Sequence, residues 1–314
     1  MRILVTGGSG LLGRSIITGL KFDDHEVLHP SSKELDLLDL TKTQSYFKEN
    51  EPDAVIHCAA RVGGIAANIS NPYSFLSDNL RIDLNTIQSA RFQKIKNFLY
   101  MGSSCMYPKN SDLSLNEEDL LTGPLEETNK SYALAKLSGA QLVENVARET
   151  GLSWRTLILS NLYGPNDHFD SERSHLVAAV INKVFDAKLN NDKTIEMWGT
   201  GLARREFTFV EDVADFVVSH IDALSDFPQY LNLGAGVDYS VKEYYEFILS
   251  AFGFDCTITP RVDLPSGMMR KLMNVKKAET FGWNPSTNIE EGLRKTLEFY
   301  LESKGVDFDK LSAS

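Results

Sequence analysis

The first half of the chain alternates short apolar runs with stretches whose apolar residues recur at helical spacing. Runs such as "RILVTG" (2–7), "AVIHCAA" (54–60), "KNFLYMG" (96–102) and "WRTLILS" (154–160) are apolar almost throughout. Strands have this pattern when helices cover both faces of a parallel sheet. Residues 11–20, about 72–92 and about 129–149 form the amphipathic stretches. The pattern predicts an α/β fold with a doubly wound parallel sheet of the Rossmann type.

The regular alternation fades after about residue 161. There, "GLARREFTFVEDVADFVVSHI" (201–221) indicates a strand followed by a helix, and no low-complexity linker separates the two halves of the chain. We therefore expect a Rossmann domain of residues 1–162 and about 207–233. A smaller mixed α/β substrate-binding lobe of residues 163–206 and 234–314 is expected to pack against it along a cleft.

Composition narrows the class of partner. The 314 residues carry a net charge of −11, which disfavours a nucleic-acid surface. No apolar run approaches the roughly 20 residues that cross a bilayer, and no signal segment precedes the first strand, so we expect a cytoplasmic protein without a membrane partner. The three cysteines, Cys58, Cys105 and Cys256, are far apart and lack CxxC spacing. This spacing favours neither a disulfide framework nor a metal site.

A glycine-rich turn predicts the cofactor. The sequence "VTGGSGLLG" (5–13) matches G-x-G-x-x-G after a strand and before a helix. In that context the glycines permit a tight turn, and backbone N–H groups at the start of the helix meet a pyrophosphate. We expect a dinucleotide to bind at Gly7, Gly8, Ser9, Gly10, Leu11, Leu12 and Gly13.

The end of the second strand favours NADP(H) over NAD. An NAD site usually carries an acidic side chain about 20 residues after the glycines, where it holds the ribose 2′-hydroxyl. Here the chain has Ser31, Ser32 and Lys33, and the first carboxylate is that of Glu34. Hydroxyl donors and a positive charge suit a 2′-phosphate. The alternative is that Lys33 is an ordinary solvated lysine.

A second motif predicts ketone reduction. In "SYALAKLSG" (131–139), Tyr132 and Lys136 are four residues apart and share one face of a helix. A cationic neighbour favours the phenolate of a tyrosine whose ordinary pKa is about 10. With Ser103 at the end of an intervening strand, the set predicts that serine polarises a carbonyl and tyrosine exchanges its proton. Lys136 would hold both the tyrosine and the nicotinamide ribose.

These motifs resemble the extended short-chain dehydrogenase/reductase superfamily. Further stretches, "HCAARVGGIAANISNP", "GSSCMYP", "LEETNKSYALAK", "NLYGPNDHFD", "SHLVAAVINK", "WGTGLARREFTFVEDVAD" and "NLGAGVDYSVKE", are similar to the GDP-L-fucose synthase family from residue 2 to about residue 300. The resemblance implies an NADPH-dependent 3,5-epimerase/4-reductase that acts on GDP-4-keto-6-deoxy-D-mannose. It also implies a homodimer that pairs the helices at about 72–92 and 129–149.

The resemblance assigns roles to individual residues. It implies that Cys105 is the base and His175 the acid of the epimerisation, and that Arg205 meets the diphosphate. The implied substrate residues are Ser104, Asn161, Lys183, Trp198, Arg205, Ser266 and Lys271. The cofactor residues expected beyond the glycine turn are Ser32, Lys33, Asp36, Leu37, Ala59, Ala60, Met101, Gly102, Lys136, Leu159, Asn161, Leu162 and His175.

One segment departs from the family pattern. In "PSGMMRKLMN" (265–274), Ser266 replaces a substrate-side aspartate, Met268 and Met269 replace Thr-Pro, and Asn274 replaces an aspartate. These positions belong to the expected substrate lobe. A related GDP-linked dideoxy or heptose sugar, reduced with or without epimerisation by this chain, therefore stays an alternative. A non-catalytic NADP sensor is the remote alternative, and it would not need Ser103, Tyr132 and Lys136 together.

Overall fold

A six-stranded parallel sheet forms the centre of the larger part of the molecule. The computed structural model describes residues 1–21, 25–109, 114–170, 174–264 and 267–306. Across the sheet the strands follow the order β2 (Glu26–Leu28), β1 (Arg2–Thr6), β3 (Ala54–His57), β4 (Asn97–Ser103), β5 (Ser153–Leu159) and β10 (Tyr230–Leu233). All neighbouring pairs are parallel.

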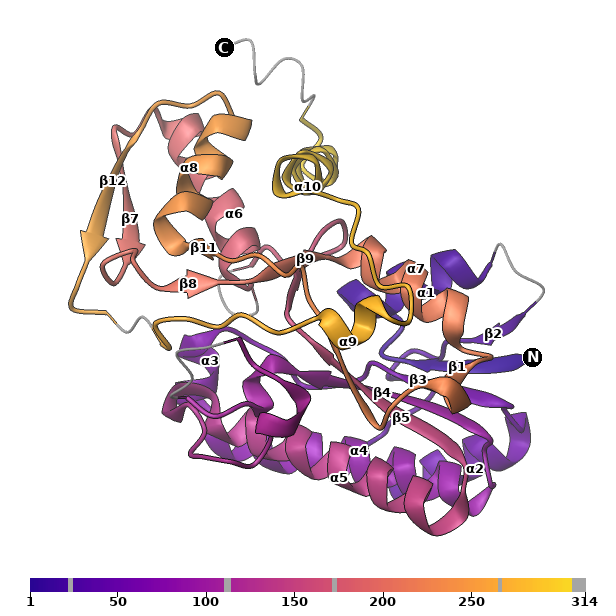
Figure 1. The fold of residues 1–314 in the computed structure, drawn as a ribbon. Helices are drawn as coiled ribbons and strands as arrows, with labels where there is room; N and C mark the ends of the chain where they lie inside the picture. Colours follow the sequence, from indigo (N-terminus) through magenta and orange to yellow (C-terminus); the bar gives the residue numbers. More distant parts are fainter. Residues whose placement is uncertain (22–24, 110–113, 171–173, 265–266, 307–314) are drawn as a thin grey trace.

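Helices cover both faces of this sheet (Figure 1). On one face lie α1 (Leu11–Leu20) and α7 (Val210–His220), and on the other lie α2 (Leu40–Asn50), α4 (Pro72–Phe92) and α5 (Lys130–Thr150). Strand β1 illustrates why its sequence is apolar throughout. Ile3 and Val5 belong to the core with α1 and α7, whereas Leu4 belongs to the core with α4 and α5. The expected doubly wound α/β fold is confirmed.

The topology places a crevice at the carboxyl ends of β1 and β3. Strand β2 pairs with one edge of β1 and β3 with the other, so the connections that leave β1 and β3 run in opposite directions. In open α/β sheets, ligands bind at such a switch point. The glycine turn follows β1, and Ala59 follows β3.

A second lobe packs its own core. It contains α6 (Leu176–Asn190), α8 (Val241–Ala251), α10 (Ile289–Ser303), the parallel pair β7 (Thr194–Trp198) and β12 (Thr257–Arg261), and the antiparallel pair β8 (Arg204–Arg205) and β11 (Tyr239–Ser240). Strands β6 (Asn161–Tyr163) and β9 (Phe207–Phe209) pair in parallel. The remaining elements are α3 (Ile65–Ser70), α9 (Lys276–Glu279) and the short 3-10 helices η1 (Ser104–Met106), η2 (Glu117–Asp119), η3 (Glu127–Asn129) and η4 (Leu224–Asp226).

The chain returns to the main sheet after the second lobe has begun. Ala278 of α9 and the following Trp283 are buried in the same core as α1 and α7. Residues 234–314 therefore contribute to both cores, and the expected domain boundaries stay a prediction. Among the residues that the structure describes, no helix is long and apolar enough to cross a membrane.

Candidate active site

The glycine turn has the close packing that its sequence predicts. Gly10 precedes α1, and its N–H donates to the Gly7 carbonyl at 3.0 Å. Gly7 has a φ of +70°, and a Cβ there would lie 2.6 Å from the Ala59 nitrogen. A Cβ at Gly13 would lie 2.9 Å from the Gly7 carbonyl carbon. Only glycine fits both positions, and the first turn of α1 holds no acidic residue, so this helix end suits an anion.

In the loop after β2, the donors of Ser31 are not available to a 2′-phosphate as expected. The backbone N–H and the hydroxyl of Ser31 both donate to a Glu34 carboxylate oxygen, each at 2.8 Å. Ser31 is thus engaged by the carboxylate that follows it. Ser32 and Lys33 stay exposed and keep their donors for a 2′-phosphate, whereas the Asp36 carboxylate accepts from the Leu38 N–H at 3.0 Å.

The other predicted cofactor residues gather along one edge of the sheet. Leu37 lies in the connection between β2 and α2, and Ala59 and Ala60 follow β3. Met101 and Gly102 lie just before the last residue of β4, Leu159 ends β5, and Asn161 and Leu162 belong to β6. Carboxyl ends of parallel strands meet at the same edge, which explains this arrangement. Leu12 differs, because its side chain is buried in the core and leaves only its backbone to face a ligand.

Ser103, Cys105 and Tyr132 come together where β4 ends. The Ser103 Oγ accepts a hydrogen bond from the Cys105 N–H at 3.2 Å. Burial raises the pKa of Tyr132, the nearby Cys105 and Asp83 act in the same direction, and a hydrogen bond with Ser103 lowers it. The expected shift towards the phenolate is therefore wrong in direction. Tyr132 stays protonated at neutral pH, which is the form that donates a proton.

Lys136 is buried above an aromatic ring. It is 2% exposed, and its Nζ lies 4.5 Å from the centre of the Tyr100 ring. The Tyr100 hydroxyl donates to an Asp83 carboxylate oxygen at 2.6 Å. The Tyr100 ring therefore contacts the Lys136 ammonium, and the Tyr100 hydroxyl contacts the buried Asp83 carboxylate.

The buried polar groups continue to the glycine turn. His57 Nε2 lies 3.0 Å from the second Asp83 oxygen, and His57 Nδ1 lies 2.6 Å from the Thr6 hydroxyl oxygen. That hydroxyl oxygen also accepts from the Ala59 N–H at 3.3 Å. Sequence reasoning missed His57, Asp83 and Tyr100. The only signal was a charged or polar residue inside an otherwise buried strand or helix face.

Cys105 differs from the other two cysteines in its surroundings. Its sulfur accepts from the Asn129 amide at 3.1 Å and from the Lys271 ammonium at 3.3 Å. Burial raises the pKa of Cys58 to about 12, which makes that thiol inert. The Cys256 sulfur lies 3.7 Å from the Asp192 carbonyl oxygen, near the β7–β12 pair.

His175 directly precedes α6. Removal from water lowers the pKa of this histidine, and the positive charges of Lys271 and His168 act in the same direction. His175 therefore lies within electrostatic reach of the lysine that contacts Cys105. The two residues implied as base and acid share one cationic neighbour.

Arg205 lies in the same site, on β8. Its Nη1 donates to the Arg204 carbonyl at 2.7 Å. Burial lowers the pKa of Arg205, while interactions with Cys105 and Glu126 raise it. A Cβ at Gly267 would lie 3.1 Å from its Nη2, so the absent side chain leaves room for the guanidinium. Arg204 points elsewhere, because its Nε donates to Asp238 at 2.9 Å.

The other predicted substrate residues are less closely joined to this cluster. Lys183 Nζ donates to the Glu196 carbonyl at 2.6 Å, and Trp198 is 43% exposed at the end of β7. Asn161 donates its amide N–H to the Glu206 carbonyl at 3.0 Å, and Ser104 is buried. Ser266 lies outside the described residues. Asn274 has a structural role, since its amide donates to Asn116 at 2.9 Å.

The geometry agrees with the comparison with known proteins. Residues 3–234 match the NAD dependent epimerase/dehydratase family. The chain belongs to this family. It is 42% identical to a GDP-L-colitose synthase of Yersinia pseudotuberculosis, over 98% of this chain and 100% of that protein. It is 37% identical to a GDP-L-fucose synthase of Azorhizobium caulinodans, over 97% of this chain and 98% of that protein. The resemblance inferred from the sequence is confirmed.

Solved structures of similar proteins have the same fold over nearly the whole chain. A GDP-6-OMe-4-keto-L-xylo-heptose reductase from C. jejuni superposes with a TM-score of 0.92 at 28% identity, covering 96% of this chain and 98% of that one. A GDP-L-fucose synthetase from Naegleria fowleri bound to NADP has a TM-score of 0.84 at 26% identity, covering 97% and 93%.

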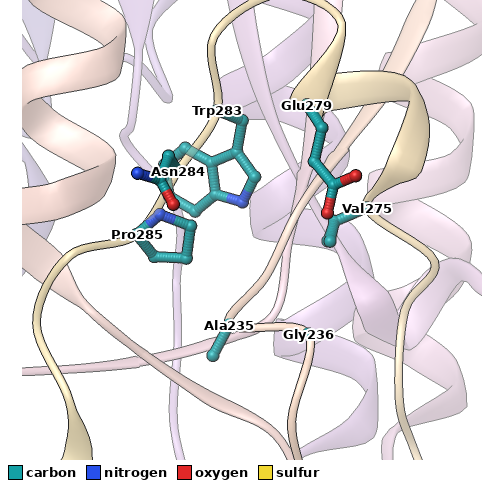
Figure 2. A pocket seen from close by; sticks show the side chains of 7 residues that line it. All are labelled: Ala235, Gly236, Val275, Glu279, Trp283, Asn284 and Pro285. Atoms are coloured by element: carbon teal, nitrogen blue, oxygen red, sulfur yellow. The ribbon is translucent and has the colours of Figure 1, made fainter.

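One cavity of this epimerase/dehydratase family member borders the glycine turn, and a second one lies elsewhere. A cavity of about 320 Å³ borders Gly8 and His29, with Arg14 and Lys21 in its wall, so basic groups line the space next to the glycine turn. A larger one of about 510 Å³ lies between α9 and the loop after β10, with Trp283 and Glu279 in its wall (Figure 2). The larger cavity contains none of the predicted catalytic residues.

Proposed function

We propose that the chain is an NADPH-dependent 3,5-epimerase/4-reductase that converts GDP-4-keto-6-deoxy-D-mannose to GDP-L-fucose. The proposal rests on three groups that come together where β4 ends. The Ser103 hydroxyl oxygen accepts from the Cys105 N–H at 3.2 Å, and both Ser103 and Cys105 influence the pKa of Tyr132. Two hydroxyls can hold one ketone oxygen while a thiol lies beside the neighbouring carbons. The names of the relatives support the same GDP-sugar chemistry.

In the epimerisation, Ser103 and Tyr132 donate to the C4 ketone oxygen and make the protons at C3 and C5 acidic. Cys105 takes a proton from carbon, and the C–H electron pair becomes the enolate, whose oxygen stays bound to the same hydroxyls. His175 returns a proton from the opposite face. Inversion needs groups on both faces, which a plain reductase would lack.

In the reduction, the same hydroxyls serve again. When bound, NADPH supplies a hydride to C4. Tyr132, whose pKa is raised by burial, is protonated and donates its proton to the C4 oxygen. The glycine turn and the first turn of α1 would hold the pyrophosphate, and Ser32 and Lys33 the 2′-phosphate.

A second candidate substrate is a related GDP-linked 4-keto sugar, dideoxy or heptose. Relatives named GDP-L-colitose synthase and GDP-heptose reductase favour it. The segment that departs from the family pattern also supports it. Met269 in that segment is 62% exposed, and its carbonyl accepts from the Arg204 N–H at 2.7 Å. The chemistry of Ser103, Cys105 and Tyr132 would be unchanged.

The test is NMR of the purified protein with GDP-4-keto-6-deoxy-D-mannose in deuterated water, with and without NADPH. We expect deuterium at C3 and C5 without NADPH, and GDP-L-fucose with it. Cys105→Ser should abolish exchange but keep reduction of the epimerised ketone, while Tyr132→Phe should lose most of the reduction. Reduction without exchange would disprove the epimerase half. If NADPH binds and neither reaction occurs, the dideoxy and heptose ketones are tested next.

We also propose that the chain forms a homodimer through α4 and α5. These helices pack on each other and leave apolar side chains on their outer surface, among them Tyr73, Leu84 and Leu134. Leu84→Glu should halve the mass measured by light scattering, and an unchanged mass would exclude this face. A cytoplasmic location stays a prediction, to be tested by cell fractionation.

A further inference from the structure

Lys271 contacts Cys105, although the two residues are far apart in the sequence. Its Nζ lies 3.3 Å from the Cys105 sulfur, across 166 residues of sequence, and the Asn129 amide nitrogen lies 3.1 Å from the same sulfur. An ammonium group has donors only, and an amide nitrogen also donates. The sulfur therefore accepts two hydrogen bonds. A thiolate accepts such bonds strongly, whereas a neutral thiol is a weak acceptor.

The lysine needs an anion at this place. Lys271 is 8% exposed, and in the described part of the chain no carboxylate lies within ion-pair distance of it. Its sequence neighbour differs, because Arg270 Nε donates to the Asp238 carboxylate at 2.6 Å. A buried charge is costly unless it is paired. The Cys105 sulfur is the group that Lys271 contacts and that can carry the opposite charge.

The backbone that follows Lys271 is fixed by two hydrogen bonds. The Leu115 N–H donates to the Leu272 carbonyl at 2.8 Å, and the Met273 N–H donates to the buried Glu206 carboxylate at 3.0 Å. Glu206 directly follows Arg205 in the chain. These bonds tie the segment to Leu115, which also forms an isolated bridge with Met273, and to Glu206, next to the strand that carries Arg205. The position of the ammonium is therefore set by the fold.

We propose that Lys271 is a positioning residue for the proton-abstraction step, and that its ammonium holds the Cys105 sulfur as the thiolate that attacks the C–H bond. This deepens the proposed function and rests on it. The thiolate takes the proton and becomes a thiol, and the C–H electron pair moves into the enolate. Loss of that proton to water then restores the ion pair. The direct substrate contact implied for Lys271 is replaced by a contact with the base.

Other charged or titratable groups also face the sulfur. Tyr132 and Arg205 both interact electrostatically with Cys105. Tyr132 is neutral near pH 7, so Arg205 is the second cation. Removal of Lys271 should therefore lower the fraction of Cys105 that is present as the thiolate without reducing it to zero. One opposite charge within contact distance shifts a titration by about 1–3 pH units.

The test follows the alkylation of Cys105 by iodoacetamide between pH 5.5 and 9.5, with peptide mass spectrometry to locate the label. Wild type is compared with Lys271→Met, which removes the charge, and Lys271→Arg, which keeps it. We expect Lys271→Met to slow alkylation of Cys105 at pH 7 at least tenfold, and Lys271→Arg to restore most of the rate. Cys256 is the internal reference. Equal pH profiles for Cys105 in wild type and Lys271→Met would overturn the proposal.

A second measurement needs no lysine variant and covers a variant that fails to fold. Thiolate absorbance near 240 nm is titrated in wild type, and the titration of Cys105→Ser is subtracted. The difference should develop well below the ordinary thiol pKa of about 8.5. A difference that develops only at or above that pH would overturn the proposal. Unfolding is detected separately as alkylation of Cys58, because removal from water raises the pKa of this thiol to about 12 in the native fold.

Neither measurement uses the sugar, so the two proposals can fail separately. A shifted alkylation profile without deuterium exchange in wild type would keep the Lys271–Cys105 pair and reject the proposed reaction. Exchange in wild type with an unshifted profile would do the reverse. If Lys271→Met weakens GDP binding at least tenfold with no change at Cys105, the lysine binds the substrate and the positioning role is wrong.

Discussion

Removal of the Tyr100 hydroxyl tests whether a charged carboxylate is buried beneath the proposed catalytic lysine. Tyr100 is fully buried, and its hydroxyl donates to Asp83 at 2.6 Å. Tyr100→Phe deletes this donor and leaves the ring in place below Lys136. Asp83 keeps its contact with His57 at 3.0 Å. The change therefore removes one short hydrogen bond to a buried carboxylate and a longer contact, at 3.5 Å, with the Lys136 carbonyl oxygen.

The size of the effect follows from the acceptor. A hydrogen bond to a charged group contributes about 1.5–3 kcal/mol, and a neutral one about 0.5–1.5 kcal/mol. The chain offers a matched control in Tyr107, which is 1% exposed and donates to the amide oxygen of Asn232 at the same 2.6 Å. We expect Tyr100→Phe to lower the free energy of unfolding by about 2–3 kcal/mol, roughly twice the loss for Tyr107→Phe.

The assay is thermal unfolding followed by circular dichroism. Unfolding entropy is about 2.1 cal/mol/K per residue, so in this 314-residue chain 1 kcal/mol corresponds to about 1.5 °C in Tm. Tyr100→Phe should therefore lower Tm by roughly 3–5 °C. NADPH affinity should change less than about twofold, because the aromatic face below Lys136 is kept. If Tyr100→Phe costs no more stability than Tyr107→Phe, Asp83 carries no charge in the folded protein and the reasoning is refuted.

Three further predictions concern the ligand sites. Gly13→Ala should weaken NADPH binding at least a hundredfold in a fluorescence titration, because its Cβ would overlap the Gly7 carbonyl. The control is Gly10→Ala, whose Cβ would lie 3.4 Å from the same carbonyl oxygen and which should weaken NADPH binding less than tenfold. Equal losses of affinity would contradict the close packing of the glycine turn. The pKa of His175 is lowered by burial, so the imidazolium that returns the proton is lost as pH rises through a value below 6.5. The rate of deuterium exchange should fall over that pH range, and His175→Gln should remove this fall. A rate that rises steadily from pH 5 to 8 would exclude His175 as the acid. Arg205→Met should weaken GDP binding at least tenfold by calorimetry and Arg204→Met much less, because Arg204 is paired with Asp238; the opposite order would exchange their roles.

The local patterns were sufficient to predict the main elements. Apolar runs predicted the strands of the main sheet, and helical spacing predicted helices at 11–20 and about 72–92, where α1 and α4 lie. Each pattern lies within one helix or strand, so it can be recognised without knowledge of the rest of the chain. The glycine turn is equally local, since its three glycines are required by one strand-to-helix connection.

The motifs also identified residues whose contacts the sequence could not define. Ser103, Cys105 and Tyr132 were selected by spacing and resemblance, and the structure brings them together. The direction of the Tyr132 pKa was predicted wrongly. The spacing to Lys136 was visible in the sequence, but the loss of water around the hydroxyl was not, and that loss dominates.

The amino-acid sequence by itself determined the fold class, the order of the elements and the set of candidate groups, because these depend on periodicity and spacing within short windows. Only the tertiary structure decided that Asp83 is buried between His57 and Tyr100, and that Lys271 lies against Cys105. Such contacts join residues far apart in the chain through the packing of helices and lobes. Their charges are set by burial, which no local pattern encodes.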